Sequence, residues 1–316
     1  MASPLDIAQF RQVMEAAADQ HARSYSSSLA VFQNILQAFS LPKAEELVIA
    51  ESDRMPGLAI RDKLDNMLTT AVSSSGRTLV LVHYAGHGED IEGELHFVGP
   101  PGHSRRERTI RANRWIFAEV DMDDSFLGPA DLVDAIFFFD SCYSHLTTRS
   151  PVRSRVVEVL AAVDASDPFA FPPRTRPSFT AEVANEIAFR KARGDRVVEF
   201  AELVQFLRAS SEVKPIYAMR VGFNSTRLTF PDILTQSTPQ FPSLQAVFSF
   251  HVYNASSDDI AEYVVWTQTL PPDIGLSSEN TYATNCDGVC LILRSSYAFY
   301  TKLAGLPGVQ LVCETR

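Results

Sequence analysis

The sequence predicts an α/β protein with a largely parallel central sheet, followed by a smaller α+β unit. Two apolar runs that hardly alternate, 78–85 and 135–139, are typical of strands covered by helices on both faces. Segments with helical periodicity lie around them, and strands that alternate with helices form layered α/β domains. With 316 residues, of which 46% are hydrophobic and 21% charged, the chain can bury a sizeable core.

The first elements follow one another from residue 29. Apolar residues recur at helical spacing from Leu29 to Phe39, and Pro42 ends the pattern, which predicts a helix. A short apolar run at 46–50 predicts a strand. Residues 59–72 then predict a second amphipathic helix, which leads into the first buried strand.

The later elements of this unit follow the second buried strand. We expect another strand at 156–163, helices at 180–193 and 199–209, and a last strand of the sheet at 215–221. Gly194 directly follows the first of these helices and is a typical C-terminal signal.

A second unit begins after a polar linker at 231–244, which is rich in Pro, Ser, Thr and Gln. Its patterns predict, in order, strand 246–252, helix 258–269, strands 280–284 and 289–294, helix 297–303 and strand 309–313. This βαββαβ order is that of a ferredoxin-like unit. We therefore divide the chain into an N-terminal extension (1–28), an α/β domain (29–230), the linker (231–244) and an accessory domain (245–316). A truncation after residue 240 is expected to leave a folded first domain.

The charge balance argues against a nucleic-acid partner, because 28 basic and 38 acidic residues give a net charge of -10. One cluster of basic residues is interspersed with polar ones and is typical of a solvated loop: Arg105, Arg106, Arg108, Arg111 and Arg114.

Neither a leader segment nor a membrane span is predicted, because no apolar run approaches the roughly 18 to 20 residues that cross a bilayer. We expect a cytoplasmic protein with no membrane partner. The four cysteines, Cys142, Cys286, Cys290 and Cys313, are too few for a disulfide scaffold and lack the CxxC spacing of a zinc site. They are expected to be reduced thiols, with Cys286 and Cys290 structural.

The ends of the two buried strands carry the residues with chemistry, as expected for an open parallel sheet. The first strand runs into His87, which has a glycine on each side, and the second into Asp140, Ser141 and Cys142. If the strands are neighbours, an imidazole and a thiol are presented together, and the imidazole can activate the thiol. The backbone amides of Gly88 and Cys142 would then form an oxyanion hole.

Each of these features alone also fits a structural interpretation. Buried cysteines are usually packing residues. His83 lies inside the first strand and is expected to be a core histidine rather than the base. His145, three residues after Cys142, does not form a metal site with it.

Together the segments His-Tyr-Ala-Gly-His87-Gly and Phe-Phe-Phe-Asp-Ser-Cys142-Tyr-Ser resemble the caspase-like cysteine peptidases, in particular metacaspases and related fungal domains. The spacing fits the roughly 50 residues typical of caspases, and the resemblance covers about residues 29–230. It implies a caspase-like three-layer fold and a dyad of Cys142 as nucleophile and His87 as acid and base. It also implies that Asp140 lies in an S1 pocket that takes Arg or Lys, the alternative being a turn or cap acid.

The chain departs from the family pattern in two places. His145 stands where the motif normally closes with glycine, and the family's first strand is not evident in residues 1–28. Calcium-dependent metacaspases carry acidic residues after the histidine. The counterparts here are Glu89, Asp90, Glu92 and Glu94, or Asp121, Asp123 and Asp124, and neither group has a calcium-loop spacing. We predict no resident metal or cofactor, with calcium as the open alternative.

The sequence thus predicts a cysteine endopeptidase that cuts a protein partner after Arg or Lys through a thioester. By resemblance, this limited proteolysis would serve regulated cell death or immunity-type signalling. The alternative is a catalytically inactive caspase-like scaffold or regulatory partner.

Overall fold

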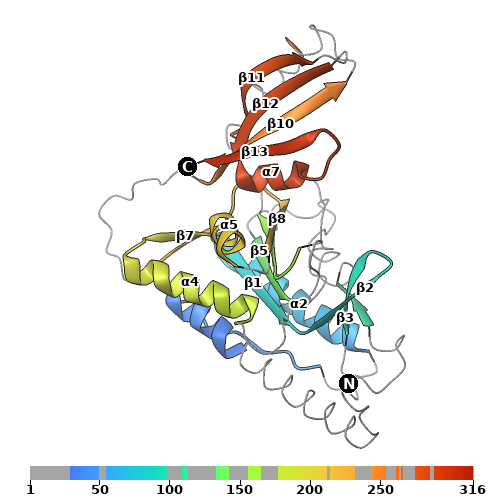
Figure 1. Cartoon of the computed structure of the whole chain (residues 1–316). Coiled ribbons are helices and arrows are strands. Elements are labelled where there is room, and N and C mark those ends of the chain that lie inside the picture. The colour runs from blue at the N-terminus through green and yellow to red at the C-terminus, as the bar shows by residue number, and fades with distance from the viewer. Residues whose placement is uncertain are drawn as a thin grey trace, which may run out of the picture.

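Four strands form the central sheet in the order β1-β5-β6-β8 (Figure 1). They are β1 (Thr78–Ala85), β5 (Val133–Asp140), β6 (Val157–Ala161) and β8 (Ile216–Val221). The computed structural model describes residues 29–49, 55–98, 109–112, 133–141, 156–164, 177–211, 214–231, 243–253, 261–262, 265, 275–284 and 288–315. Strands β1, β5 and β6 are parallel, and β8 is an antiparallel edge strand. The prediction of an α/β protein with a largely parallel sheet is confirmed.

Strand β5 lies at the centre of the hydrophobic core, and each of its eight residues is buried. Ile136 and Phe138 pack into a cluster that includes Phe32 of the helix at residues 29–38. Phe137 and Phe139 point the other way, into a second cluster. Burial on both faces explains why this strand has an almost unbroken apolar sequence.

Helices cover both faces of this sheet. They are the helix at residues 29–38, α2 (Pro56–Ser73), α4 (Phe179–Arg193) and α5 (Phe200–Ser210), all close to the predicted ranges. Helix α4 begins at Ser178, whose side chain accepts a hydrogen bond from the Ala181 N–H. It ends at Gly194, which has a positive φ of 91° that suits glycine. No helix among the described residues is long and apolar enough to cross a membrane.

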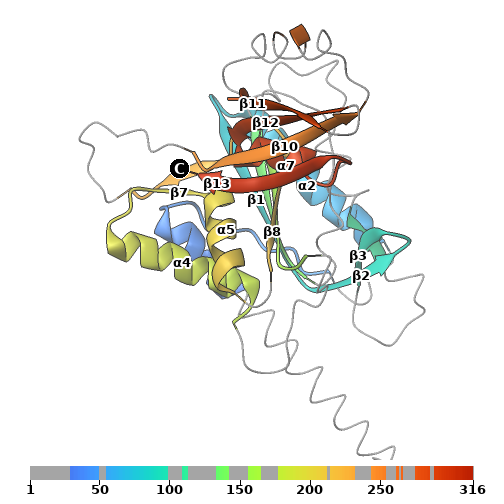
Figure 2. The same cartoon turned by 45° about the horizontal axis from the view of Figure 1, so that its top comes forward.

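Two small sheets flank the central one and are absent from the sequence prediction. Strands β2 (His87–Ile91), β3 (Glu94–Val98) and β4 (Thr109–Arg111) form one, and β7 (Val197–Glu199) and β9 (Arg227–Thr229) form the other. The β2–β3 hairpin projects from the body on the side away from α4 (Figures 1 and 2).

The strand predicted at residues 46–50 is wrong. Residues 41–49 have no regular structure, and Val48 is 73% exposed. Leu47 and Ile49 are also exposed. An apolar run of this length is ambiguous on its own, and here no neighbouring strand pairs with the described part of it.

The C-terminal unit contains β10 (Gln245–Tyr253), β11 (Ser277–Thr284), β12 (Gly288–Ser296), α7 (Tyr297–Leu303) and β13 (Val309–Thr315). Its sheet has the order β11-β12-β10-β13, and all neighbours are antiparallel. Hence β10 runs parallel to β11 with β12 between them, and β12 runs parallel to β13 with β10 between them. Two split βαβ units would give this interleaved order, and α7 is the helix of the second. Most of the predicted helix 258–269 lies outside the described residues.

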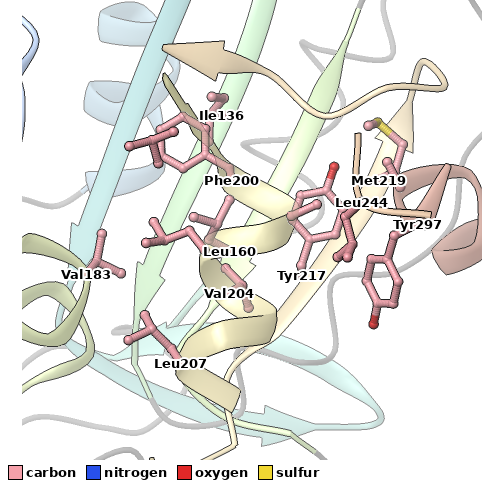
Figure 3. Packing of buried hydrophobic residues seen from close by; sticks show 14 of the residues in the cluster. Ile136, Leu160, Val183, Phe200, Val204, Leu207, Tyr217, Met219, Leu244 and Tyr297 are labelled. Atoms are coloured by element: carbon pink, nitrogen blue, oxygen red, sulfur yellow. The ribbon is translucent and has the colours of Figure 1, made fainter. Parts of the chain in front are cut away.

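The C-terminal unit shares its hydrophobic core with the central sheet. Figure 3 shows Tyr217 and Met219 of β8 next to Leu244 and Tyr297, in the same buried cluster as Leu160 of β6. Helix α7 lies between the two sheets (Figure 1). The polar segment 231–244 therefore does not separate two independent cores.

Backbone groups also join the two units. The Met219 N–H of β8 donates to Thr301 Oγ1 of α7 at 3.0 Å. Ser296 Oγ, directly before α7, donates to the Phe223 carbonyl. The Tyr297 N–H also donates to the Leu244 carbonyl at the end of the linker, at 2.8 Å. Helix α7 thus covers the edge strand of the central sheet, whose groups would otherwise be open to another strand.

A buried carboxyl group lies at the start of β6. Glu158 is fully buried and accepts hydrogen bonds from Ser225 Oγ at 3.0 Å and from the Thr226 N–H. Burial outweighs these bonds and raises the pKa of Glu158 from 4.5 to about 7. Between these two values the folded state binds more protons than the unfolded state, so stability falls as the pH rises.

We expect Glu158→Gln to remove this pH dependence. The free energy of unfolding of the variant, minus that of the wild type, should increase by about 2 to 3 kcal/mol between pH 4.5 and pH 8. Urea unfolding at several pH values measures this difference. Glu46→Gln makes the same chemical change at an exposed position and is the matched control. A constant difference for Glu158→Gln would show that folding does not raise the pKa of this carboxyl, and would contradict the prediction.

A candidate Cys-His site at the edge of the central sheet

Strands β1 and β5 are neighbours, which is the condition for their ends to form one site. They pair in parallel, and Ala85, the last residue of β1, lies opposite Asp140, the last residue of β5. The Gly86 N–H donates to the Asp140 carbonyl at 3.3 Å, so the pairing continues to the end of both strands. The chain therefore leaves both strands at the same edge of the sheet, where a parallel α/β sheet binds its ligands.

His87 lies directly at this edge. Only Gly86 separates β1 from β2, and His87 is the first residue of β2. The Tyr84 hydroxyl donates to the His87 carbonyl at 2.9 Å, which holds the turn in place. A Cβ atom at position 86 would collide with the Tyr84 ring, so the sharp turn between the strands requires glycine here. The imidazole is thus carried by a short, well-fixed connection.

Cys142 lies outside the described residues. The chain is described as far as Ser141, which is fully buried at the end of β5. In the sequence, His87 follows Ala85 by two positions, and Cys142 follows Asp140 by two positions. Ala85 and Asp140 face each other in the two strands.

The predicted oxyanion hole is only half described. Gly88 is buried in β2 opposite Phe97. The amide of Cys142 lies outside the described residues, and the pairing of these two amides stays a prediction. His145, which replaces the usual glycine of the motif, lies in the same segment.

Asp140 is held inside the protein. Its side chain is only 1% exposed, and Oδ2 accepts two hydrogen bonds from Thr180 of α4, from Oγ1 at 2.7 Å and from the N–H at 3.1 Å. The start of α4 carries a partial positive charge that favours a carboxylate. These hydrogen bonds fit the second interpretation from the sequence, in which Asp140 is a turn or cap acid. The S1 assignment stays a prediction, because residues 142–155 lie outside the described ranges.

His83 is half-buried and lies beside Asp140 and Thr180. Its ring stacks on Phe32 with a centroid distance of 4.4 Å, and Nε2 lies 2.9 Å from Thr180 Oγ1. Burial lowers the pKa of His83 to about 4, against the opposing charge of Asp140. It is therefore neutral at neutral pH. These contacts are those expected of a core histidine.

Thr180 and Phe32 are contacts that sequence reasoning missed. Thr180 lies two residues after Ser178, the residue that caps α4, and this position at the start of a predicted helix is the signal that could have found it. Nothing in the sequence pairs Phe32 with a histidine 51 positions away in the chain.

A second Cys-His pair lies in the C-terminal sheet. Cys290 of β12 faces His251 of β10 across the two central strands, with Sγ and Nε2 3.6 Å apart. Cys290 and Cys313 are free thiols. Cys286 and the turn that was predicted around it lie outside the described residues. This pair lies in a different sheet from β1 and β5.

The acidic residues considered for calcium lie on the β2–β3 hairpin. Asp90 Oδ1 accepts a hydrogen bond from the Gly93 N–H at 2.8 Å and thereby closes the turn. Glu92 and Gly93 both have positive φ, as a two-residue hairpin turn of type I′ requires. Within the described ranges, no three His, Cys, Asp or Glu side chains are grouped so that they could hold a metal ion. The second acidic group, Asp121 to Asp124, lies outside those ranges.

Only one member of the predicted basic cluster is described. Arg111 of β4 is exposed, and its Nε lies 3.6 Å from Glu94 Oε2. Arg105, Arg106, Arg108 and Arg114 lie outside the described residues. An exposed ion pair of this kind contributes little to stability and is typical of a solvated face.

Comparison of the chain with protein-family models, with curated proteins and with solved structures gave no match.

Proposed function

We propose that this chain is a caspase-like cysteine endopeptidase, with Cys142 as nucleophile and His87 as acid and base. The observation that carries the proposal is the register of β1 and β5. Ala85 faces Asp140 in adjacent parallel strands, and His87 and Cys142 each follow one of these facing residues by two positions in the sequence. The motif resemblance supports the same assignment, as does the predominantly parallel sheet with helices on both faces.

In the proposed reaction, His87 takes the proton of the Cys142 thiol as sulfur attacks the carbonyl carbon of the scissile peptide bond. The oxyanion that forms accepts hydrogen bonds from the Gly88 and Cys142 amides. His87 then protonates the leaving amine, and the C–N bond breaks to leave a thioester. Water, deprotonated by His87, hydrolyses the thioester and restores the thiol. No metal or cofactor takes part in these steps.

By resemblance, the substrate is a protein with Arg or Lys before the scissile bond, cut in regulated cell death or immunity-type signalling in the cytoplasm. The C-terminal unit is then an accessory part of ferredoxin-like type. The preference depends on Asp140, because a carboxylate in a partly dry pocket attracts a guanidinium and repels an acidic side chain.

A peptide library tests both the activity and the preference. The purified protein is incubated with proteome-derived peptides, and mass spectrometry identifies the new termini. We expect cleavage after Arg and Lys and none after Asp, and no new termini with Cys142→Ala. Cleavage after Asp would overturn the specificity. The absence of any cleavage, with a folded protein, would favour the inactive scaffold.

A further inference from the structure

A chain of hydrogen bonds joins three elements immediately before the position of the nucleophile. The Thr180 N–H and hydroxyl both bind Asp140 Oδ2, and His83 Nε2 binds the same hydroxyl. Thr180 and Asp140 are each 1% exposed. The bonds link β1, β5 and α4, and the ring of Phe32 adds the helix at residues 29–38.

The direction of each bond follows from the donors present. The Thr180 hydroxyl has one hydrogen, and it points to Asp140 because a carboxylate oxygen accepts. The hydroxyl oxygen must then accept from His83, so the neutral imidazole carries its proton on Nε2. His83 therefore has a fixed tautomer and a fixed orientation, and it directs the Thr180 hydroxyl toward Asp140.

This chain fixes the point from which the segment bearing Cys142 departs. Asp140 is the last residue of β5, and Cys142 follows it by two positions. A displacement of about 1 Å at a reacting group can cost a factor of about 100 in rate. The bonds to Asp140 thus act where a small shift of the backbone has a large effect on the nucleophile.

We propose that Thr180 and His83 are positioning residues that act through Asp140 on the segment carrying Cys142. This inference rests on the proposed peptidase function. It gives Asp140 a role shared by all substrates, in addition to the proposed S1 role, which concerns basic residues alone. The two roles give different kinetic results.

The test uses two substitutions of Thr180 in the full chain. Thr180→Val keeps the shape but removes the hydroxyl, and Thr180→Ser keeps the hydroxyl. The kinetic constants are measured on two peptides that differ only in Arg or a neutral residue before the scissile bond. Loss of one buried hydrogen bond of this kind corresponds to roughly a 5- to 30-fold change. We expect Thr180→Val to lower kcat by about 10-fold or more on both peptides, with little change in KM, and Thr180→Ser to restore it.

Two further variants separate positioning from general stability. Phe248→Leu shrinks a fully buried side chain of the C-terminal unit without touching Asp140 or α4, so it should lower the melting temperature and leave kcat unchanged. His83→Phe keeps an aromatic ring against Phe32 but removes the donor, and it should lower kcat in the same way as Thr180→Val.

The outcomes distinguish this inference from the proposed function. A wild type that cleaves neither peptide overturns both. An active wild type overturns this inference alone if Thr180→Val has normal kcat, if Phe248→Leu loses as much, or if the loss falls only on KM for the Arg peptide.

Discussion

Replacing Cys142 by alanine should abolish peptide hydrolysis, and His87→Ala should lower kcat nearly as much. The two side chains act as one unit, so removing either removes most of what the pair contributes, at least about 1,000-fold in kcat. The losses should not add in the double variant. Steady-state kinetics on one peptide with Arg before the scissile bond measures all three.

The second Cys-His pair provides the matched controls. Cys290→Ala and His251→Ala remove a thiol and an imidazole that lie 3.6 Å apart in the C-terminal sheet, and both should leave kcat within about twofold of the wild type. His83 is unsuitable as a control because it binds Thr180. Normal activity of folded His87→Ala protein would show that another group is the base.

Truncation after residue 240 should give a chain that does not fold. It removes Leu244 and Tyr297 from a buried cluster shared with β8, and it leaves the Met219 N–H without its partner on Thr301. The deletion exposes a large apolar surface and an edge strand. We expect the resulting loss in the free energy of unfolding to exceed the roughly 5 to 15 kcal/mol that is typical of a whole domain. We expect an insoluble or aggregated product by gel filtration and no cooperative melting.

Point variants give the graded form of this result. Phe248 is fully buried in the shared cluster, with its ring 5.4 Å from that of Tyr300, and Phe248→Ala should cost about 3 to 5 kcal/mol. Val312 on β13 is 57% exposed, so Val312→Ala should cost less than about 0.5 kcal/mol. A soluble, cooperatively folded fragment ending at residue 240 would instead support two independent domains.

The elements with continuous apolar or clearly periodic sequences were predictable. Strand β1 and helix α7 occupy the ranges expected from the sequence. Strand β1 is nevertheless an edge strand in which only Val80 is buried, so its apolar sequence overstated its burial. Strands β2 and β3 were missed, since His87 to Ile91 is mostly polar and reads as a loop. The apolar run at residues 46–50 was predicted to be a strand and is not one, because a strand also needs a neighbouring strand with which to pair.

The sequence predicted the positions of the candidate site residues in the chain but not the contacts between distant segments. The sequence placed His87 after β1 and Asp140 before the cysteine, and adjacency of the strands completes that argument. It could not decide which groups hold the Asp140 carboxylate, because Thr180 is 40 positions away and its bond depends on where α4 begins. The shared core of the two units could not be predicted for the same reason. A polar linker does not show which apolar faces pack against each other.

Site-specific labelling tests the central claim most directly. The full chain is treated with a peptide that carries Arg at its end and a thiol-reactive group in place of the scissile bond, and peptide mapping by mass spectrometry locates the adduct. We predict a single adduct on Cys142, lost in Cys142→Ala, formed much more slowly in His87→Ala and unchanged in Cys290→Ala. An adduct on Cys290, or labelling at Cys142 that is equally fast without His87, would contradict the dyad.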